Sequence, residues 1–254
     1  MGSRLAGRHA LVTGGGTGIG AAVAEQLSAE GTTLSLLGRR MGPLNAVAEA
    51  VGGSAIACDV SDPDAIGRAF DEARAANGPI DMLIVNAGIA DSAPFARISR
   101  ESWQRIIAVN LTGAFDCAQA ALPDLLKSEN GRLVFVASVA GLQGVAYAAH
   151  YAASKHGLIG LMRSLAAEYA KTSLTVNAVC PGFVDTPMTR QTAERLVEKT
   201  GRSEDQALAA ITAMNASGRL VQPAAVATMI ATLCLPESRD VNGAAITIDG
   251  GTSA

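Results

Sequence analysis

The stretch His9-Ala10-Leu11-Val12-Thr13-Gly14-Gly15-Gly16-Thr17-Gly18-Ile19-Gly20 joins a short apolar run to a loop rich in glycine. Residues 21–30 then have the pattern of a helix that closes at Gly31. Glycine lets the backbone turn tightly and approach a pyrophosphate, and a helix N-terminus offers free amides and a partial positive charge. Strand, loop and helix together predict a nucleotide site, in preference to a tight turn without a ligand. The predicted contacts are Gly14, Thr17, Gly18, Ile19 and Gly20.

Short apolar runs alternate with helical patterns along most of the chain after this loop. Six further runs are predicted strands: Thr33–Gly38, Ala55–Asp59, Met82–Asn86, Arg132–Ser138, Thr175–Val179 and Ala245–Ile248. Repetition of strand and helix is typical of a parallel sheet with helices on both faces. The predicted fold class is therefore α/β, a Rossmann-type doubly wound domain with a seven-stranded parallel sheet. A chain of 254 residues suits one such domain, residues 1–254, better than two small ones.

The most polar long stretch runs from Met188 to about Gly218 and carries charged residues among spaced apolar ones. This pattern predicts two short surface helices joined near Gly201. Because the stretch lies between the sixth and seventh predicted strands, it is a candidate helical lid over the carboxyl edge of the sheet, at about residues 188–218. The alternative is a static surface excursion.

The composition argues against several classes of function. The formal net charge is −3 and no basic run stands out, so we expect no nucleic-acid partner. No uninterrupted apolar run reaches about 18 residues, and none follows the N-terminus, so we expect neither a membrane span nor a secretory signal. The four cysteines are scattered and the three histidines form no ligand cluster. This pattern predicts reduced buried thiols, no metal site and a cytoplasmic protein.

The residues after the second predicted strand bear on the choice of cofactor. An acidic side chain there would bind the ribose 2′-hydroxyl of NAD, whereas a basic one accommodates the 2′-phosphate of NADP. The chain has Gly38-Arg39-Arg40, with no Asp or Glu before Glu49. Arginine offers a planar fork to a phosphate. We therefore predict NADP, with NAD as the alternative, and contacts from Arg39 and Arg40. The competing interpretation of Arg39 is a solvated surface charge.

Small and polar residues end the third and fourth predicted strands. Asp59-Val60 is predicted to contact the adenine, although Asp59 is equally suited to cap the following helix. Asn86-Ala87-Gly88 would let the backbone pass close to the cofactor, because its residues are small. These two strand ends extend the predicted cofactor site.

A second motif, Tyr151-Ala152-Ala153-Ser154-Lys155, carries the predicted chemistry. Residues four apart share one helix face, so the Lys155 ammonium would lie beside the Tyr151 phenol and lower its pKa from about 10. Such a phenol exchanges a proton near neutral pH. Ser138 follows an apolar strand, which puts its hydroxyl at the carboxyl edge where ligands bind. With the nucleotide loop, these residues predict hydride chemistry on a carbonyl or an alcohol.

These motifs, in this order, resemble the short-chain dehydrogenase/reductase family from about Gly7 to Gly251. The resemblance also rests on Asn110, Asn177, Pro181-Gly182 and Asp249-Gly250-Gly251. One departure is Val85, where the family often has a second asparagine, and we expect it to alter only local packing. The resemblance implies an oxidoreductase, rather than a non-catalytic nucleotide-binding scaffold on the same fold.

The resemblance also implies roles for the matching residues. Tyr151 would be the catalytic acid/base, Ser138 would donate to the substrate oxygen, and Lys155 would lower the tyrosine pKa and bind the nicotinamide ribose. Asn110 would hold a water that links Lys155 to solvent. The segment after the sixth predicted strand would line the nicotinamide through Pro181, Gly182, Val184 and Thr186.

The segment between the serine and the tyrosine is expected to wall the substrate pocket. Its predicted polar contacts, beside Ser138 and Tyr151 themselves, are Gln143, Tyr147 and His150, and His150 is as well suited to packing. This segment resembles the ketoreductases of polyketide and fatty-acyl synthesis. The resemblance implies NADP-linked reduction of a 3-oxoacyl thioester on acyl carrier protein or CoA. The alternative oxidoreductase is a secondary-alcohol, sugar or steroid dehydrogenase.

Two further expectations concern the surface of the protein. Family members are usually tetramers, so a homotetramer is expected. The candidate lid carries four basic residues that either meet a carrier phosphate or form a solvated face balanced by glutamates: Arg190, Arg195, Lys199 and Arg202.

Overall fold

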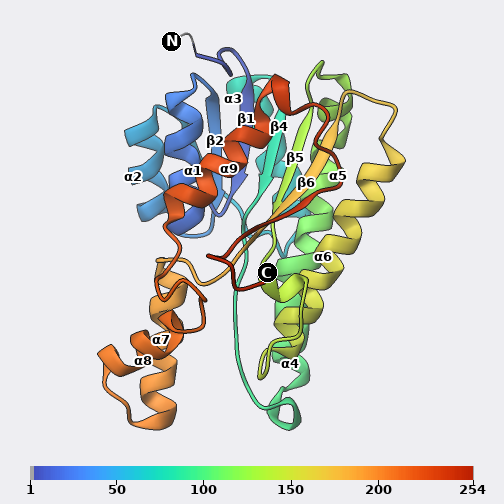
Figure 1. Cartoon of the computed structure of the whole chain (residues 1–254). Coiled ribbons are helices and arrows are strands. Elements are labelled where there is room, and N and C mark those ends of the chain that lie inside the picture. Colours follow the sequence, from blue (N-terminus) through green and yellow to red (C-terminus); the bar gives the residue numbers. More distant parts are fainter. Residues whose placement is uncertain (1–2, 254) are drawn as a thin grey trace.

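The computed structural model describes residues 3–253, and its centre is a seven-stranded sheet (Figure 1). The strands pair in parallel in the order β3-β2-β1-β4-β5-β6-β7. The winding reverses between β1 and β4, and open α/β sheets bind ligands at such a point. The predicted Rossmann-type α/β fold is confirmed. The strands are β1 His9–Thr13, β2 Thr33–Gly38, β3 Ser54–Ala57, β4 Met82–Val85, β5 Arg132–Val136, β6 Thr175–Pro181 and β7 Ala245–Ile248.

Helices cover both faces of the sheet, since successive residues of a strand point to opposite sides. In β1, Leu11 belongs to a buried cluster with α3, α5 and α6, whereas Ala10 and Val12 belong to another with α1, α2 and α9. Burial on both faces explains the unbroken apolar runs of the sequence. The helices are α1 Gly18–Ala29, α2 Met41–Val51, α3 Pro63–Asn77, α4 Arg100–Ile107, α5 Gly113–Lys127, α6 Ala149–Glu168, α7 Pro187–Thr200, α8 Glu204–Thr212 and α9 Pro223–Cys234.

Helix α1 begins earlier than predicted, and α6 begins just before Tyr151. Helix α1 begins at Gly18 rather than at residue 21, so the last glycines of the loop form its first turn. Helix α6 begins at Ala149, so Tyr151 lies inside its first turn. Strands β3, β4 and β5 end one or two residues earlier than predicted, which leaves polar side chains at the carboxyl edge of the sheet: Asp59, Asn86 and Ser138.

The polar stretch after β6 forms the two helices α7 and α8, as predicted. Gly201 ends α7 with a φ of 69°, and Ser203 and Gln206 cap α8 reciprocally. A small buried cluster that includes Ala193 and Ile211 holds the two helices together. In Figure 1 this pair stands apart from the helices that cover the sheet.

One helical stretch among the described residues, 100–127, is long and apolar enough to cross a membrane by length and composition. It comprises α4, a π-helical turn at Ala108–Thr112, and α5. Helix α5 packs against α3 and β4. The match is weak support for a membrane span, because core helices of folded proteins also satisfy it.

Candidate active site

A cavity of about 600 Å³ follows the carboxyl edge of the sheet. It extends from the glycine loop after β1, past the end of β5 and the first turn of α6, to α7. Most of the predicted site residues line it: Gly14, Thr17, Gly18, Ile19, Arg39, Arg40, Asp59, Val60, Asn86, Ala87, Gly88, Ser138, Tyr147, Tyr151, Lys155, Pro181, Gly182, Val184 and Thr186. The topology thus brings residues from seven separate segments into one space.

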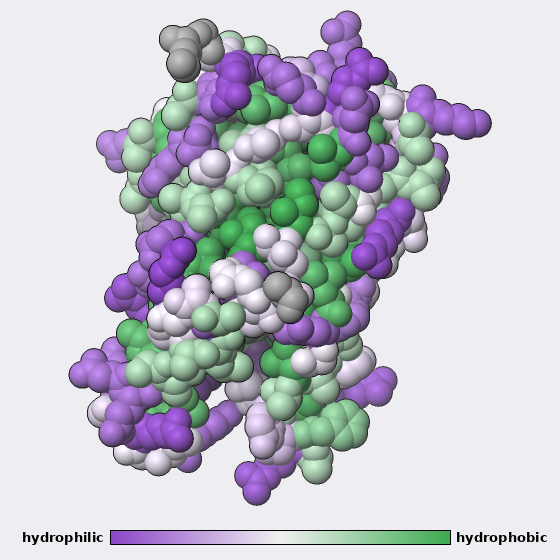
Figure 2. Space-filling view, in the orientation of Figure 1, coloured by the Kyte–Doolittle hydropathy of each residue, from purple (hydrophilic) through white to green (hydrophobic). Residues whose placement is uncertain are grey.

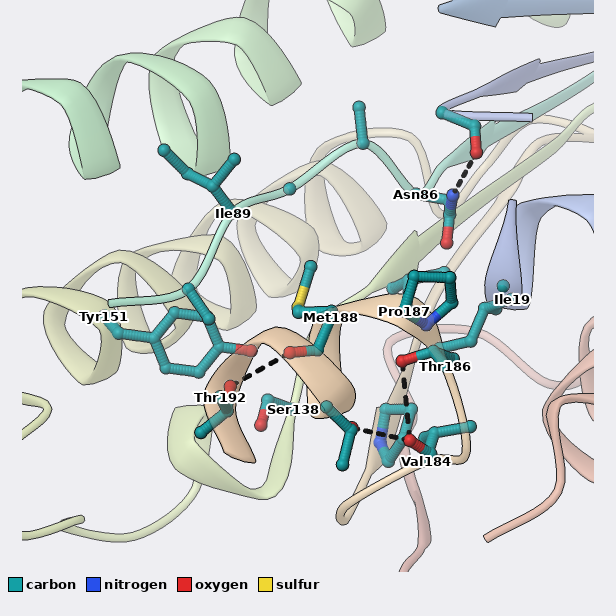
Figure 3. Close-up of a pocket in the computed structure, with 18 of the residues that line it drawn as sticks. Ile19, Asn86, Ile89, Ser138, Tyr151, Val184, Thr186, Pro187, Met188 and Thr192 are labelled. Carbon is teal, nitrogen blue, oxygen red and sulfur yellow. Dashed lines mark hydrogen bonds between the residues drawn. The ribbon is translucent and has the colours of Figure 1, made fainter. Parts of the chain in front are cut away.

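The nucleotide loop is tied to the end of β4 by hydrogen bonds. Thr13 Oγ1 accepts from the backbone N–H groups of Asn86 and Ala87, both at 3.0 Å. Asn86 Nδ2 donates to the carbonyl oxygens of Thr13 at 2.9 Å and Gly14 at 3.1 Å (Figure 3). Sequence reasoning did not assign Thr13 a role, although a hydroxyl at the end of a buried apolar strand was a usable signal.

Glycine is required at two positions of this loop. Gly14 has a φ of 66°, and a Cβ there would lie 3.0 Å from the Cα of Ala87. A Cβ at Gly20 would collide with the carbonyl oxygen of Gly14 and lie 2.6 Å from Asn86 Nδ2. Gly20 therefore lets α1 pack beneath the loop, which corrects its predicted role as a cofactor contact. The resulting cradle at a helix N-terminus fits a pyrophosphate in space and charge.

Arg39 and Asp59 meet at the other side of the nucleotide cradle. Arg39 Nη1 lies 3.5 Å from Asp59 Oδ2, and both side chains are exposed. Burial opposes ionisation of Asp59, but hydrogen bonds from Ser61 and the charge of Arg39 together lower its pKa. The helix cap that Asp59 was equally suited to form is made by Asp62, which accepts from the N–H groups of Asp64 and Ala65. Asp59 instead accepts from the N–H and Oγ of Ser61 and lines the cavity.

Tyr151 and Lys155 lie on one face of α6, as the spacing predicts. Lys155 Nζ lies 5.8 Å from the centroid of the Tyr151 ring and donates to the carbonyl oxygen of Val136 at 2.9 Å. Burial raises the pKa of the Tyr151 phenol, against a smaller lowering by a hydrogen bond with Ser138. Burial lowers the pKa of Lys155 to about 8. The predicted lowering of the tyrosine pKa is therefore wrong for the chain itself, because desolvation exceeds the opposing effect of the hydrogen bond with Ser138.

Ser138 and Tyr151 project into the same space from different elements (Figure 3). Ser138 follows β5 and caps the short 3₁₀ helix Val139–Gly141, where its Oγ accepts from Ala140 N at 3.1 Å. Its hydroxyl hydrogen can be donated either to Tyr151, whose pKa this hydrogen bond lowers, or to a ligand oxygen. Met188 and Thr192, both from α7, also line this end of the cavity.

Asn110 lies behind the cavity, in the π-helical turn between α4 and α5. Its amide exchanges hydrogen bonds of 2.9 Å with the backbone N–H and C=O of Ile89, and its Nδ2 also lies 3.2 Å from Ser154 Oγ. A Cβ at Gly88 would lie 3.4 Å from Asn110 Oδ1 and 3.7 Å from Lys155 Nζ. Asn110 and Lys155 therefore flank the same point of the backbone. A π-helical turn inside an α-helix is frequent at functional sites.

Gln143 and His150 do not reach the cavity, which corrects their predicted contacts with substrate. Gln143 follows the 3₁₀ turn and is exposed. His150 is fully buried, and neither ring nitrogen has a hydrogen-bond partner among the described residues. It precedes Tyr151 on α6, and neighbouring residues of a helix point in directions about 100° apart. Because Tyr151 points into the cavity, His150 points away from it, into the interior of the protein.

The basic residues of α7 are engaged within the chain. Arg195 Nη1 donates to the carbonyl oxygen of Ala90 at 2.9 Å and lies 3.7 Å from Asp91. Lys199 Nζ donates to the carbonyl oxygen of Ser92 at 2.9 Å. The segment 89–93, which follows β4, is thereby clasped to α7 across the cavity. Arg190 pairs with Asp185 at 3.5 Å on the surface.

The cavity-lining residues near α7 and α8 that sequence reasoning missed are mostly apolar. Phe183, Met188, Leu196, Ile211 and Met214 line the cavity from the side of α7 and α8. Only their spacing among the charges of the stretch could have indicated them. Within residues 3–253, no group of three or more His, Cys, Asp or Glu is placed to hold a metal ion.

Comparisons with known proteins agree with this geometry. The family model described as short chain dehydrogenase matches residues 8–197. The 3-oxoacyl-[acyl-carrier-protein] reductase MabA of Mycobacterium tuberculosis is 38% identical, over 96% of this chain and 92% of its own. The corresponding reductase FabG of Escherichia coli is 36% identical, over 96% of this chain and 97% of its own.

A solved structure shows the same likeness in three dimensions. A variant of actinorhodin polyketide ketoreductase with NADPH matches with a TM-score of 0.93 and 35% identity, over 99% of both chains. Fold, site and likeness agree along most of the chain. The chain therefore belongs to the short-chain dehydrogenase family and is an NAD(P)-dependent oxidoreductase, as its motifs predict.

Proposed function

We propose that the protein uses NADPH to reduce the 3-oxo group of an acyl thioester, carried on acyl carrier protein or CoA, to a secondary alcohol. One observation carries the proposal: Ser138, Tyr151 and Lys155 lie at one end of a cavity whose other end holds the nucleotide cradle and Arg39. The names of the relatives, 3-oxoacyl-[acyl-carrier-protein] reductases and a polyketide ketoreductase with NADPH, support the same reaction and cofactor.

In this reaction NADPH, when bound, supplies a hydride to the carbonyl carbon. The Tyr151 hydroxyl gives its proton to the carbonyl oxygen, and the Ser138 hydroxyl donates a hydrogen bond that stabilises the developing charge. Because burial raises the Tyr151 pKa, the phenol is held protonated and ready to donate. Lys155, whose pKa burial lowers to about 8, can then return a proton to the phenolate.

The proton that Lys155 gives away must be replaced from solvent. We propose Asn110 for this step, through a water held between its amide and the lysine. Their common position beside Gly88 supports the proposal. The same Asn110 amide fixes Ile89, so it also positions the wall of the cavity.

We further propose that the chain is one dinucleotide-binding domain, residues 1–254, with α7 and α8 as its lid. We propose that it works in the cytoplasm as a homotetramer and has neither nucleic acid nor a membrane as a partner. The net charge of −3 and the four free buried cysteines support this setting. Trp103 on α4 and Phe115 on α5 are exposed aromatic residues that suit a contact between copies. Sedimentation of the purified protein as a monomer would contradict the oligomer.

Substrate and cofactor are tested together by following oxidation of the reduced nicotinamide. We expect the highest kcat/KM for NADPH with acetoacetyl-CoA, when it is compared with a panel of cyclic ketones, steroids and sugars. A higher kcat/KM for any compound of that panel would favour the alternative dehydrogenase activity. A clear preference for NADH would refute the role of Arg39. Binding of NADPH without turnover of any carbonyl would favour a non-catalytic scaffold.

A further inference from the structure

Tyr147 has an unusual backbone conformation at the mouth of the cavity. It is the one non-glycine residue with a positive φ, 63°, in the described range 3–253. It is the third residue of the turn from Val145 to Ala148, which is closed by a hydrogen bond of 3.3 Å from Ala148 N to Val145 O. A positive φ at this turn position is normally supplied by glycine or asparagine. A bulky aromatic residue there is strained, and strain of this kind often marks functional sites.

Burial of the ring does not offset this strain, because the Tyr147 side chain is not packed inside the protein. Its residue is 67% exposed, yet it lines the cavity that holds Ser138 and Tyr151. The turn is held in place from outside by a hydrogen bond of 2.8 Å from Ala93 N to Tyr147 O. Ala93 is the last residue of the segment 89–93, which Asn110 and α7 hold in place. The backbone around the mouth therefore presents a phenol ring to a ligand rather than to the core.

The other wall of the mouth comes from α7 and the end of α8. Met188 is 40% exposed and Met214 is 51% exposed, and both line the same cavity as Tyr147. Leu196 and Ile211 line it too. In Figure 2 the surface is hollowed between the lobe of α7 and α8 and the rest of the molecule. Flexible methionines suit apolar ligands of variable shape.

We propose that Tyr147 is a specificity-determining residue which, with Met188 and Met214, binds an apolar group beyond the reacting carbonyl. The protein then favours a long acyl chain over a short one. The identity of the reacting group as a 3-oxoacyl thioester rests on the proposed function, whereas the apolar contact does not. Burial of methylene groups against these three side chains would supply the preference. We expect at least a tenfold preference in kcat/KM for a ten-carbon over a four-carbon 3-oxoacyl chain.

Three variants of Tyr147 separate the ring from the backbone strain. Tyr147→Phe keeps the ring, Tyr147→Asn tolerates the positive φ without a ring, and Tyr147→Gly removes both ring and strain. Phe95→Asn is the matched control, because Phe95 is an exposed aromatic residue, 79%, outside the cavity lining. The substrates are N-acetylcysteamine thioesters of 3-oxobutanoate and 3-oxodecanoate. A second pair, 2-butanone and 2-decanone, lacks the thioester.

The inference predicts that Tyr147→Asn and Tyr147→Gly lose most of the chain-length preference, while Tyr147→Phe and Phe95→Asn keep it. Tyr147→Gly should also raise Tm by roughly 2 °C, because it relieves the strained turn. An equal preference in wild type and Tyr147→Asn, or no preference in wild type, would overturn the inference. If wild type reduces neither thioester but reduces the simple ketones, the proposed function fails, and the ketone pair still decides the role of Tyr147.

Discussion

The nucleotide end and the substrate end of the cavity are lined by different kinds of groups. At the nucleotide end, glycine backbone, the Thr13 hydroxyl and the Asn86 amide form a cradle in which added atoms would collide. At the substrate end, the walls are joined by partly exposed contacts such as Arg195 to Asp91, and exposed side chains such as Tyr147 line the mouth. Partly exposed ion pairs such as that of Arg195 with Asp91 each contribute little stability. The cofactor, which is the same in every turnover, therefore meets closely packed backbone, whereas the substrate meets exposed side chains that can adjust to it.

The largest effect is expected from Tyr151, the proposed proton donor, which lies between the nucleotide end and the substrate end of the cavity. Tyr151→Phe keeps the ring in its buried place and removes only the proton donor. We expect kcat to fall by about 100-fold or more, the usual scale of acid–base catalysis, while NADPH still binds. Steady-state turnover measures kcat, and fluorescence titration measures the binding of NADPH. Wild-type turnover in a folded Phe variant would contradict the mechanism.

The nucleotide end is tested through Arg39, whose exposed side chain pairs with Asp59. Arg39→Met should raise the KM for NADPH about tenfold and leave that for NADH nearly unchanged, since only the former carries a 2′-phosphate for a charge-assisted hydrogen bond. Arg68→Met is the matched control, because Arg68 pairs with Asp62 at 4.0 Å outside the cavity. Equal losses for both cofactors would mean that Arg39 supports the loop through Asp59 instead.

The nucleotide end of the cavity could be predicted from the sequence more fully than the substrate end. The seven parallel strands, the nucleotide loop and the meeting of Asn86, Ser138 and Tyr151 follow from local periodicity and from parallel strands ending at one edge, whereas the order of the strands was not predicted. The direction of His150 depends on the rotation of α6, which the pattern around it left open. The partner of Arg195 is the carbonyl oxygen of Ala90, 105 residues earlier in the chain, so no spacing rule indicates it.

Two further residues show why the substrate end escapes sequence analysis. Tyr147 was predicted as a pocket wall, but nothing in its neighbours announces a positive φ, which its turn imposes. The pKa of Tyr151 was predicted to fall because a cation lies four residues away, yet burial of the phenol raises it. Both outcomes depend on the packed surroundings rather than on spacing.

The clasp between α7 and the segment after β4 gives a smaller effect. Arg195→Met removes the hydrogen bond to Ala90 and the ion pair with Asp91. We expect the KM for the thioester to rise about fivefold, because a hydrogen bond of this kind contributes about 1 kcal/mol to holding the wall. Arg190→Met is the control on the same helix. An equal rise in both variants that disappears at high salt would instead indicate contact with a carrier phosphate.

The smallest effect concerns Lys155, where the two ends meet. Its pKa is about 8 in the folded protein against the ordinary value of 10.5 in the unfolded chain, so the unfolded chain binds more protons between these pH values. The free energy of unfolding should therefore rise with pH across this window. Relative to Lys155→Met, which lacks the titrating amine, wild type should gain about 1 kcal/mol between pH 7 and pH 9. Buried thiols titrate in the opposite sense, since burial raises the pKa of Cys58 to about 11, but they are common to both proteins. Denaturant unfolding of both proteins at the two pH values measures the change, and a wild type that gains no stability over Lys155→Met between pH 7 and pH 9 would mean that the folded protein leaves the lysine solvated.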